Sequence, residues 1–342
     1  MIRVNMKFNL QRFADTTITV APNLVQEAWA KDTWEAGFEK TFFMKFTGKS
    51  ALDIVQIKEE LKKEAGDAIT IPLLMPLTGA GIAGDNILEG NEEALIYRDF
   101  KVSIDQIRNA VRLKGKMDEQ KTQIDMRKDA KHALSNWLAN HIDDAIFTAL
   151  STNPTADRTV FAGSATSEGT ITTSDVFTAD LIGKIKRVAT GTKQNQVKPV
   201  KVDGMDTYVL VIDPFQARDL TSDQKWINAQ QNANVRGSKN PIFTGALGMY
   251  NGVIVHESAR VLRTQSGTSA PKVGHALFLG AQAAVMAVGS EPSWEEETFD
   301  YKNKVGFSFG RIFGIAKSQY KFDGTNLTDF GVINVLTSSA DD

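Results

Sequence analysis

The stretch AITIPLLMPLTGAGIAG, residues 68–84, decides much of how this chain must fold. Residues 69–78 alternate two sets of side chains, which is the period of a β-strand with two different faces. Pro72 and Pro76 lack the N–H that a sheet ladder requires, so the segment can only be an edge strand. One face carries Ile69, Ile71, Leu73, Met75 and Leu77, and the other carries Thr70, Pro72, Leu74, Pro76 and Thr78.

A second extended arm returns after a tip that contains Gly79, Gly81 and Gly84. This arm alternates apolar and polar side chains: Phe100, Val102 and Ile104 against Lys101, Ser103 and Asp105. Residues 67–115 are therefore predicted to form one ribbon, with arms that reach about 30 Å. A lone two-stranded ribbon is marginally stable in water, so we expect a neighbouring subunit to cover it.

The composition excludes several classes of protein. The chain has 342 residues, enough for two lobes, and is 42% hydrophobic and 23% charged, as in ordinary globular proteins. Its 39 basic and 41 acidic residues give no basic field for tight binding of nucleic acid. The absence of cysteine excludes disulfides, thiol catalysis and cysteine–zinc sites. No apolar run approaches the roughly 20 residues of a membrane span, and the first ten residues lack a secretion signal. We therefore expect no membrane partner and synthesis in a cytoplasm.

Helices are predicted on both sides of the ribbon. Residues 1–66 are expected to form a flexible arm, up to Pro22, and then a helix capped by Asn23 with Trp29, Phe38, Phe42 and Phe43 on its apolar face. The strongest helix signal runs from Lys116 to Leu150, where apolar residues recur at intervals of three and four. Such a helix would be about 50 Å long, a spine for the unit 116–175.

A second lobe is predicted over residues 176–290. Thr178 is expected to cap a helix that ends at Gly191, and the run Tyr208–Ile212 is apolar throughout, as in a central strand covered on both faces. Asp213 and Pro214 begin a short helix. Further strands are predicted at 252–255, 276–279 and 283–288, and residues 291–342 are expected to return to the sheet of the first unit and end in a tail. Because strands and helices mix without βαβ alternation, the fold class is α+β.

Two segments resemble phosphate-binding motifs but lack features that such motifs require. Gly79, Gly81 and Gly84 match the dinucleotide fingerprint, but a proline-containing edge precedes them and another breaker, Gly90, follows where a helix should begin. Gly48-Lys49-Ser50 resembles the end of a P-loop, but its first glycine would fall at Phe43. Neither motif predicts a nucleotide site, and no cofactor is expected.

The residues that could carry catalysis or a metal are sparse. His132 and His141 lie nine positions apart on the predicted spine, too far to share one metal, and Asp143 and Asp144 fit a solvated helix face better than a ligand set. Glu295, Glu296 and Glu297 are expected to be a solvated acidic run. An enzyme or ligand-binding protein that uses the 176–290 lobe, with His256, Glu257 and Asp213 as its polar groups, is the alternative hypothesis.

Taken in order, these segments resemble a tailed-phage major capsid protein with the Hong Kong phage-type fold, most closely the subfamily typified by the coliphage called N-four. The resemblance covers nearly the whole chain. It is carried by Gln26-Glu27-Ala28-Trp29, residues 69–93, residues 242–253, Ala276-Leu277-Phe278-Leu279-Gly280 and Asp300-Tyr301.

The resemblance implies a structural protein, with no enzyme activity, that builds an icosahedral head of hexamers and pentamers around double-stranded DNA. The 67–115 ribbon would be the E-loop, which lies over the neighbouring subunit, the 116–175 unit would be the P-domain, and the 176–290 lobe would be the A-domain. Some members of the family crosslink through an E-loop lysine, but this chain has no lysine between Asp67 and Asp99. It also has no long scaffolding segment before Pro22, so a separate scaffolding protein and a portal are expected partners. Ion pairs of Glu89, Glu92 and Glu93 with Arg98 and Arg108 are expected between subunits. The alternative is that these residues form a solvated edge. The residues expected to contact other subunits are Leu73, Met75, Leu77, Gly79, Gly81, Gly84, Glu89, Glu92, Glu93 and Arg98.

Overall fold

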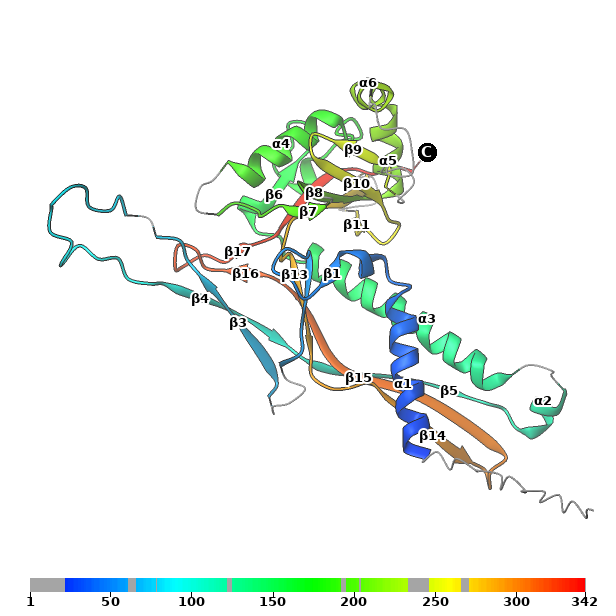
Figure 1. Ribbon diagram of the computed structural model, residues 1–342. Coiled ribbons are helices and arrows are strands. Elements are labelled where there is room, and N and C mark those ends of the chain that lie inside the picture. The colour runs from blue at the N-terminus through cyan, green and yellow to red at the C-terminus, as the bar shows by residue number, and fades with distance from the viewer. Residues whose placement is uncertain are drawn as a thin grey trace, which may run out of the picture.

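The computed structural model describes residues 22–60, 66–77, 79–121, 125–191, 195–202, 204–232, 246–265 and 271–341. Figure 1 shows an elongated molecule with a compact lobe at one end, a long sheet with two helices beside it, and a ribbon that projects away from both. The mixture of helices and sheets confirms the α+β prediction. The predicted N-terminal arm lies outside the described residues.

The first sheet runs along the long axis of the molecule in the order β1-β2-β13-β15-β14. Strand β5 also pairs with β15, along residues 306–313. The longest strand of the sheet, β15, has glycine at three positions where a neighbouring strand approaches closely. The side chains of Phe299 and Arg108 lie over Gly306 and Gly310, and the backbone of Ser103 lies over Gly314. The strands are β1 (Thr47–Gly48), β2 (Val55–Lys58), β5 (Asp105–Arg112), β13 (Ala284–Val288), β14 (Ser293–Phe299) and β15 (Lys304–Lys317).

Helices cover one face of this sheet, and their bounds correct two predictions. The predicted spine from Lys116 to Leu150 is divided into α2 (Lys116–Lys121) and α3 (Met126–Ser151). Asp125 begins α3, because its side chain accepts a hydrogen bond from Lys128 N at 3.3 Å. Its 26 residues give α3 a length of about 39 Å instead of 50 Å. The first helix, α1 (Pro22–Phe38), ends before Phe42 and Phe43, which lie in the 3₁₀ helix η1 (Phe42–Phe46).

The ribbon forms where it was predicted, but with shorter arms. Strands β3 (Ala68–Leu74) and β4 (Tyr97–Ser103) pair antiparallel, with Ile69 opposite Val102. Ile69 and Val102 are buried, and they pack on Val285 and Ala287 of β13. Met75 and Leu77, expected in the first arm, lie beyond the last strand residue. The chain then enters β5, which the sequence analysis did not predict before the long helix.

The second sheet forms the compact lobe, in the order β6-β18-β12-β8-β10-β9, with β11 on β12 and β7 on β8. The predicted central strand is β8, in which Tyr208–Ile212 is buried, and β6 is a strand that was not predicted. The strands are β6 (Thr159–Phe161), β7 (Val200–Val202), β8 (Met205–Ile212), β9 (Gly248–Tyr250), β10 (Val253–Glu257), β11 (Arg263–Thr264), β12 (Val273–Leu279) and β18 (Val332–Ser338).

Three α-helices surround this sheet: α4 (Ala179–Thr190), α5 (Pro214–Ser222) and α6 (Gln224–Asn232), and the 3₁₀ turns η3 (Ala156–Arg158) and η4 (Glu168–Thr170) precede them. Asp213 caps α5 as predicted, because its carboxylate accepts from Phe215 N at 3.2 Å. Thr178 occupies the cap position of α4 without a side-chain hydrogen bond. Asp223 takes that role, since its carboxylate accepts from Ala179 N at 2.8 Å.

Two strands join a different sheet from the one that the predicted division of the chain implies. β13, within 176–290, lies in the long sheet, and β18, within 291–342, lies in the compact lobe. The small sheet of β16 (Gln319–Tyr320) and β17 (Thr328–Asp329) connects β15 to β18. The chain therefore crosses between the lobes more than once. Among the described residues, no helix is both long and apolar enough to cross a membrane.

Candidate functional site

The most unusual surface of the molecule is the loop between β3 and β4, residues 75–96, which we call the tip loop. Its large apolar side chains face solvent: Leu77 is 63% exposed, Ile87 75% and Leu95 63%. Leu88, Ile96 and the adjacent Tyr97 are exposed by about as much. An extended segment that exposes this many apolar side chains marks a surface for binding another protein.

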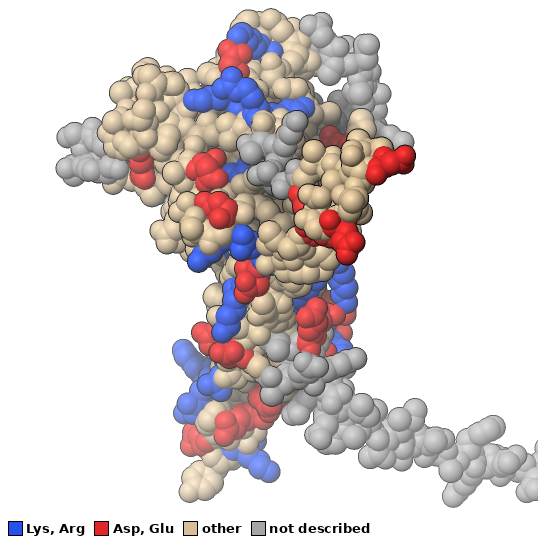
Figure 2. All heavy atoms as spheres, turned by 90° about the vertical axis from the view of Figure 1, so that its left-hand side faces the viewer, with Lys and Arg blue, Asp and Glu red and all other residues tan. Residues whose placement is uncertain are grey.

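All charged side chains of the tip loop are acidic. Residues 75–96 contain Asp85, Glu89, Glu92 and Glu93 and no lysine or arginine. These four carboxylates lie among the exposed apolar side chains and are themselves exposed. Figure 2, which views the molecule from the side of the tip loop, shows basic and acidic side chains close together along the narrow lower part of the molecule. The tip loop therefore favours a partner surface that is apolar and basic.

The shape of the tip loop comes from its glycines. Gly81, Gly84 and Gly90 have positive φ angles of 68°, 67° and 88°, a conformation that glycine adopts without strain. Gly79 lies under the side chain of Glu93, where a Cβ atom would be only 2.3 Å from Glu93 Oε1. The result is a hollow of about 530 Å³ whose lining includes Leu77, Ile82, Leu88, Glu92 and Glu93.

The structure distributes the predicted contact residues over two regions. Leu77, Gly79, Gly81, Gly84, Glu89, Glu92 and Glu93 all lie in the exposed tip loop. Leu73 and Met75 are half-buried nearer the base. Arg98 is half-buried at that base, next to the turn at Gly324, and Arg108 lies on β5 over Gly310. The expected ion pairs of the acidic residues with Arg98 and Arg108 were predicted between subunits, and they stay a prediction.

Sequence reasoning missed several exposed apolar residues. Ile82, Ile87, Leu88, Leu95 and Ile96 follow no strand or helix period, so nothing in their spacing distinguishes them from core residues. Their exposure becomes evident only when the loop is seen to lie away from both lobes (Figure 1).

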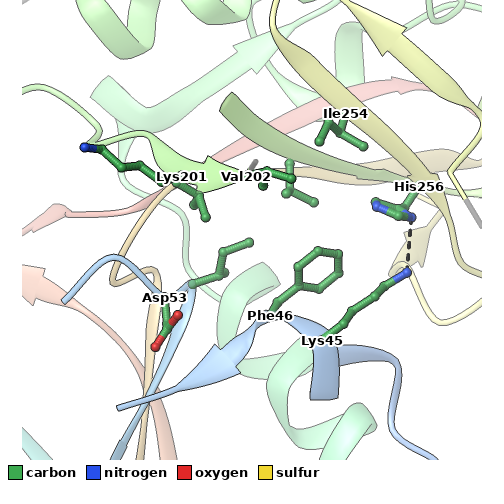
Figure 3. A pocket seen from close by; sticks show the side chains of 10 residues that line it. Lys45, Phe46, Asp53, Lys201, Val202, Ile254 and His256 are labelled. Atoms are coloured by element: carbon green, nitrogen blue, oxygen red, sulfur yellow. Dashed lines mark hydrogen bonds between the residues drawn. The ribbon is translucent and has the colours of Figure 1, made fainter. Parts of the chain in front are cut away.

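His256 is one of the three polar residues of the enzyme hypothesis. It lines a pocket of about 280 Å³ between η1 and the residues Asp53 and Ile54 on one side and β7, β8 and β10 of the compact lobe on the other. Lys45 points at His256, with Nζ 3.5 Å from Nδ1 (Figure 3). The loss of solvent on burial lowers the pKa of Lys45. The rings of Phe42 and Phe46 lie 5.4 and 5.1 Å from Lys45 Nζ, so the lysine is held among aromatic rings at the contact between the lobes.

Asp213 and Glu257 do not join His256 in a common site. The Asp213 carboxylate accepts a 2.6 Å hydrogen bond from Ser339 Oγ and lies 3.5 Å from Arg263 Nε, besides capping α5. Glu257 is exposed at the end of β10. His256 packs against Phe42 and Phe46, with ring centroids 6.1 and 5.3 Å away. The contacts of Asp213 and His256 are therefore structural.

The remaining candidates also have structural partners. Asp143 accepts from Phe42 N at 2.9 Å, and burial raises its pKa, while Asp144 pairs with Arg260. Lys49 of the P-loop-like motif lies 2.6 Å from Glu59, and Glu296 of the acidic run lies 2.5 Å from Arg127. Within the described ranges, no group of three or more His, Asp or Glu side chains could hold a metal ion.

Comparison with known proteins gives a consistent result. A family model described as phage capsid protein matches residues 17–341. The major capsid protein of Pseudomonas phage KPP25 is 31% identical over 363 aligned positions, which cover 93% of this chain and 96% of that protein. The capsid of Ralstonia phage GP4 has 32% identity and a TM-score of 0.77, over 88% of this chain and 92% of that one. The capsid asymmetric unit of Cyanophage Pam1, at 24% identity, shares the fold with a TM-score of 0.74 over the same shares of the two chains.

Proposed function

Because the chain belongs to the phage capsid protein family, we propose that it assembles with copies of itself into the hexamers and pentamers of an icosahedral head. It is a major capsid protein with the Hong Kong phage-type fold, a structural protein of the virion and not an enzyme. The enzyme hypothesis for the compact lobe is thereby rejected.

The observation that carries the proposal is the exposed tip loop. A subunit in isolation leaves Leu77, Ile87, Leu88 and Leu95 in water. Each large apolar side chain contributes about 1.5–3 kcal/mol when it is fully buried, and that contribution requires a partner. A shell supplies one, because every subunit has neighbours. The tip loop is accordingly proposed to be the E-loop, lying on an adjacent copy.

The predicted division of the chain is proposed to match the parts of this fold. The N-terminal arm and helix are residues 1–66, the E-loop ribbon is 67–115, and the P-domain with its spine is 116–175. The A-domain is 176–290 apart from β13, which lies in the long sheet, and residues 291–342 return to the P-domain before β18 joins the compact lobe. Placement in the subfamily typified by the coliphage called N-four is proposed on the order of the resembling segments.

Further partners follow from the charge and the sequence. A net charge of −2 suits a wall that encloses double-stranded DNA, because a strongly basic wall would hold the phosphates tightly. We propose that DNA contacts are non-specific, that a separate scaffolding protein directs assembly, and that a portal occupies one vertex. Assembly is proposed to occur in the cytoplasm of the host bacterium.

Negative-stain electron microscopy of purified protein tests the proposal. We expect shells or capsomers from the full chain, and soluble, folded subunits without closed shells after deletion of residues 76–91. A matched control replaces Met205 and Leu262, exposed apolar residues outside the tip loop, with serine, and should leave shells intact. Normal shells from the deletion variant would show that the tip loop is dispensable.

A further inference from the structure

We infer that the hollow of the tip loop receives one particular segment of a second copy, the turn at residues 299–304, which we call the far turn. This inference rests on the proposed self-assembly and adds the identity of the contacting surface.

The far turn presents one aromatic side chain to solvent. Tyr301, between β14 and β15, is 104% exposed, more than any other large apolar or aromatic residue that the structure describes. Aromatic residues account for a large share of interface binding energy when they enter a pocket, and tyrosine is enriched among such hot spots. The tip loop offers a pocket of about 530 Å³, with Leu77, Ile82 and Leu88 in its lining.

The backbone of the far turn is strained. Asp300, Tyr301 and Lys302 have positive φ angles of 55°, 48° and 68°, and none of them is glycine. Each such residue is disfavoured by roughly 1–3 kcal/mol and persists only where the surroundings hold it. Lys304 and Asp300 pair across the turn, with Nζ 3.4 Å from Oδ2. The turn thus holds Tyr301 in water, where its ring is available to another molecule.

The charges of the two segments are complementary. The far turn is joined to the segment 112–121, because Lys116 N donates to Asn303 Oδ1 at 3.5 Å and the Arg112 guanidinium lies 4.1 Å from the Phe299 ring centroid. Together these segments contain Arg112, Lys114, Lys116, Lys121, Lys302 and Lys304 against Asp118, Glu119 and Asp300, a sequence charge of +3. The tip loop has four acidic residues and no basic one, a charge of −4. Met117, 70% exposed, adds apolar surface beside the basic groups.

The two segments cannot meet within one subunit. In Figure 1 the tip loop and the far turn lie at opposite ends of the elongated molecule. A contact between them is therefore head to tail and joins two copies through different surfaces. Contacts of this type generate closed rings when the rotation between subunits closes, which is the arrangement that a capsomer requires.

A crosslinking experiment tests the contact directly, because the chain has no cysteine of its own. Leu88→Cys places a thiol in the tip loop, and Lys302→Cys places one beside Tyr301. After treatment of assembled shells with a short bis-maleimide, we expect the double variant to give a ladder of covalent oligomers in SDS. Each single variant should give no ladder beyond a dimer.

The control pair combines Leu88→Cys with Met205→Cys, which lies on β8 of the compact lobe. Shells of the first pair that give no ladder, or no more than the control pair, would overturn the inference. Absence of shells from the unmodified chain would instead refute the proposed function, so the two failures are distinguishable.

Substitution of the tyrosine provides a second test. Tyr301→Ala should reduce the yield of shells at least about tenfold, as expected for a hot spot, while circular dichroism of the subunit stays unchanged. Tyr301→Phe, which keeps the ring, should assemble within about twofold of the unmodified chain. Equal yields from Tyr301→Ala and the unmodified chain would contradict the inference.

Discussion

Lys317 and Asp329 form an ion pair inside the protein, with Nζ 3.0 Å from Oδ1 and side chains only 8% and 0% exposed. The same carboxylate accepts from Thr155 N at 3.1 Å and from Gln319 Nε2 at 2.7 Å. Lys317 ends β15 of the long sheet, and Asp329 lies just before β18 of the compact lobe. The pair therefore fastens the two lobes at a point where the chain crosses between them.

Asp329→Ala should lower the free energy of unfolding by about 3–5 kcal/mol, because it leaves the buried ammonium of Lys317 without its carboxylate. Urea unfolding of the subunit, followed by tryptophan fluorescence, measures the change. The matched control is Lys49→Ala, which removes an exposed pair with Glu59 and should cost about 0–1 kcal/mol. Similar losses from the two variants would show that the buried pair has no special role.

The stability of the compact lobe should depend on the protonation of His275. Thr264 Oγ donates to Glu168, so His275 Nε2, 2.8 Å away, must be the donor to Thr264 Oγ. The buried Nδ1 has no hydrogen-bond partner among the residues that the structure describes, and burial lowers the pKa of His275 below its ordinary 6.5. As the pH falls below 6.5, the unfolded chain binds a proton that the folded chain resists. Stability is therefore full above that pH and is lost as the pH falls towards the folded pKa.

The measurement is the urea midpoint at pH 7.5 and at pH 5. We expect a lower midpoint at pH 5, and a smaller difference for His275→Gln, whose amide can still donate to Thr264. His132→Gln, at an exposed position on α3, should keep the full difference. An unchanged pH dependence in His275→Gln would place the acid sensitivity elsewhere.

The sequence predicted elements whose signal is contained within one segment. Tyr208–Ile212 is apolar throughout and is a buried central strand, and Asp213 before Pro214 caps a helix. The strand β5 was missed because the ribbon was predicted to continue to residue 115, whereas the chain changes partner after Ser103, from β3 to β15. The change coincides with a shift of the apolar alternation from Phe100, Val102 and Ile104 to Ile107 and Val111, a shift that was not used in the prediction. The spine was predicted too long because the apolar period runs through the cap at Asp125.

The candidate site was predicted only in part, for a similar reason. The glycine tip and the acidic residues could be recognised from the sequence, and the structure places them together in one exposed loop. The apolar residues 82, 87, 88, 95 and 96 could not be recognised as surface residues, because hydrophobicity alone predicts burial. Tyr301 belongs to a segment that carries the family resemblance. Its full exposure, however, depends on a turn of three residues with positive φ, which the sequence does not predict.

Gly81→Val should impair assembly without unfolding the subunit. A Cβ atom at Gly81 meets nothing within 4 Å, so the subunit has space for it, but φ is +68° there. A left-handed conformation costs roughly 1–2 kcal/mol for a residue with a side chain, and the tip loop would respond by changing shape. The yield of shells on a sucrose gradient measures assembly, and circular dichroism measures folding. Gly169→Val, at an open position with ordinary φ, is the control. Shells at normal yield from Gly81→Val would mean that the shape of the tip is unimportant.

The shell should be held together without covalent bonds. The chain has no cysteine, and it has no lysine between Asp67 and Asp99 that could form an isopeptide bond from the E-loop ribbon. Boiling in SDS should therefore reduce mature particles to a single band near 37.5 kDa. The Leu88→Cys, Lys302→Cys shells treated with bis-maleimide serve as the positive control for a ladder. A ladder from untreated, unmodified particles would require a crosslink from a lysine outside residues 67–99, and mass spectrometry of the bands would locate it. A single band would instead mean that apolar and ionic contacts of the kind seen at the tip loop suffice to hold the shell.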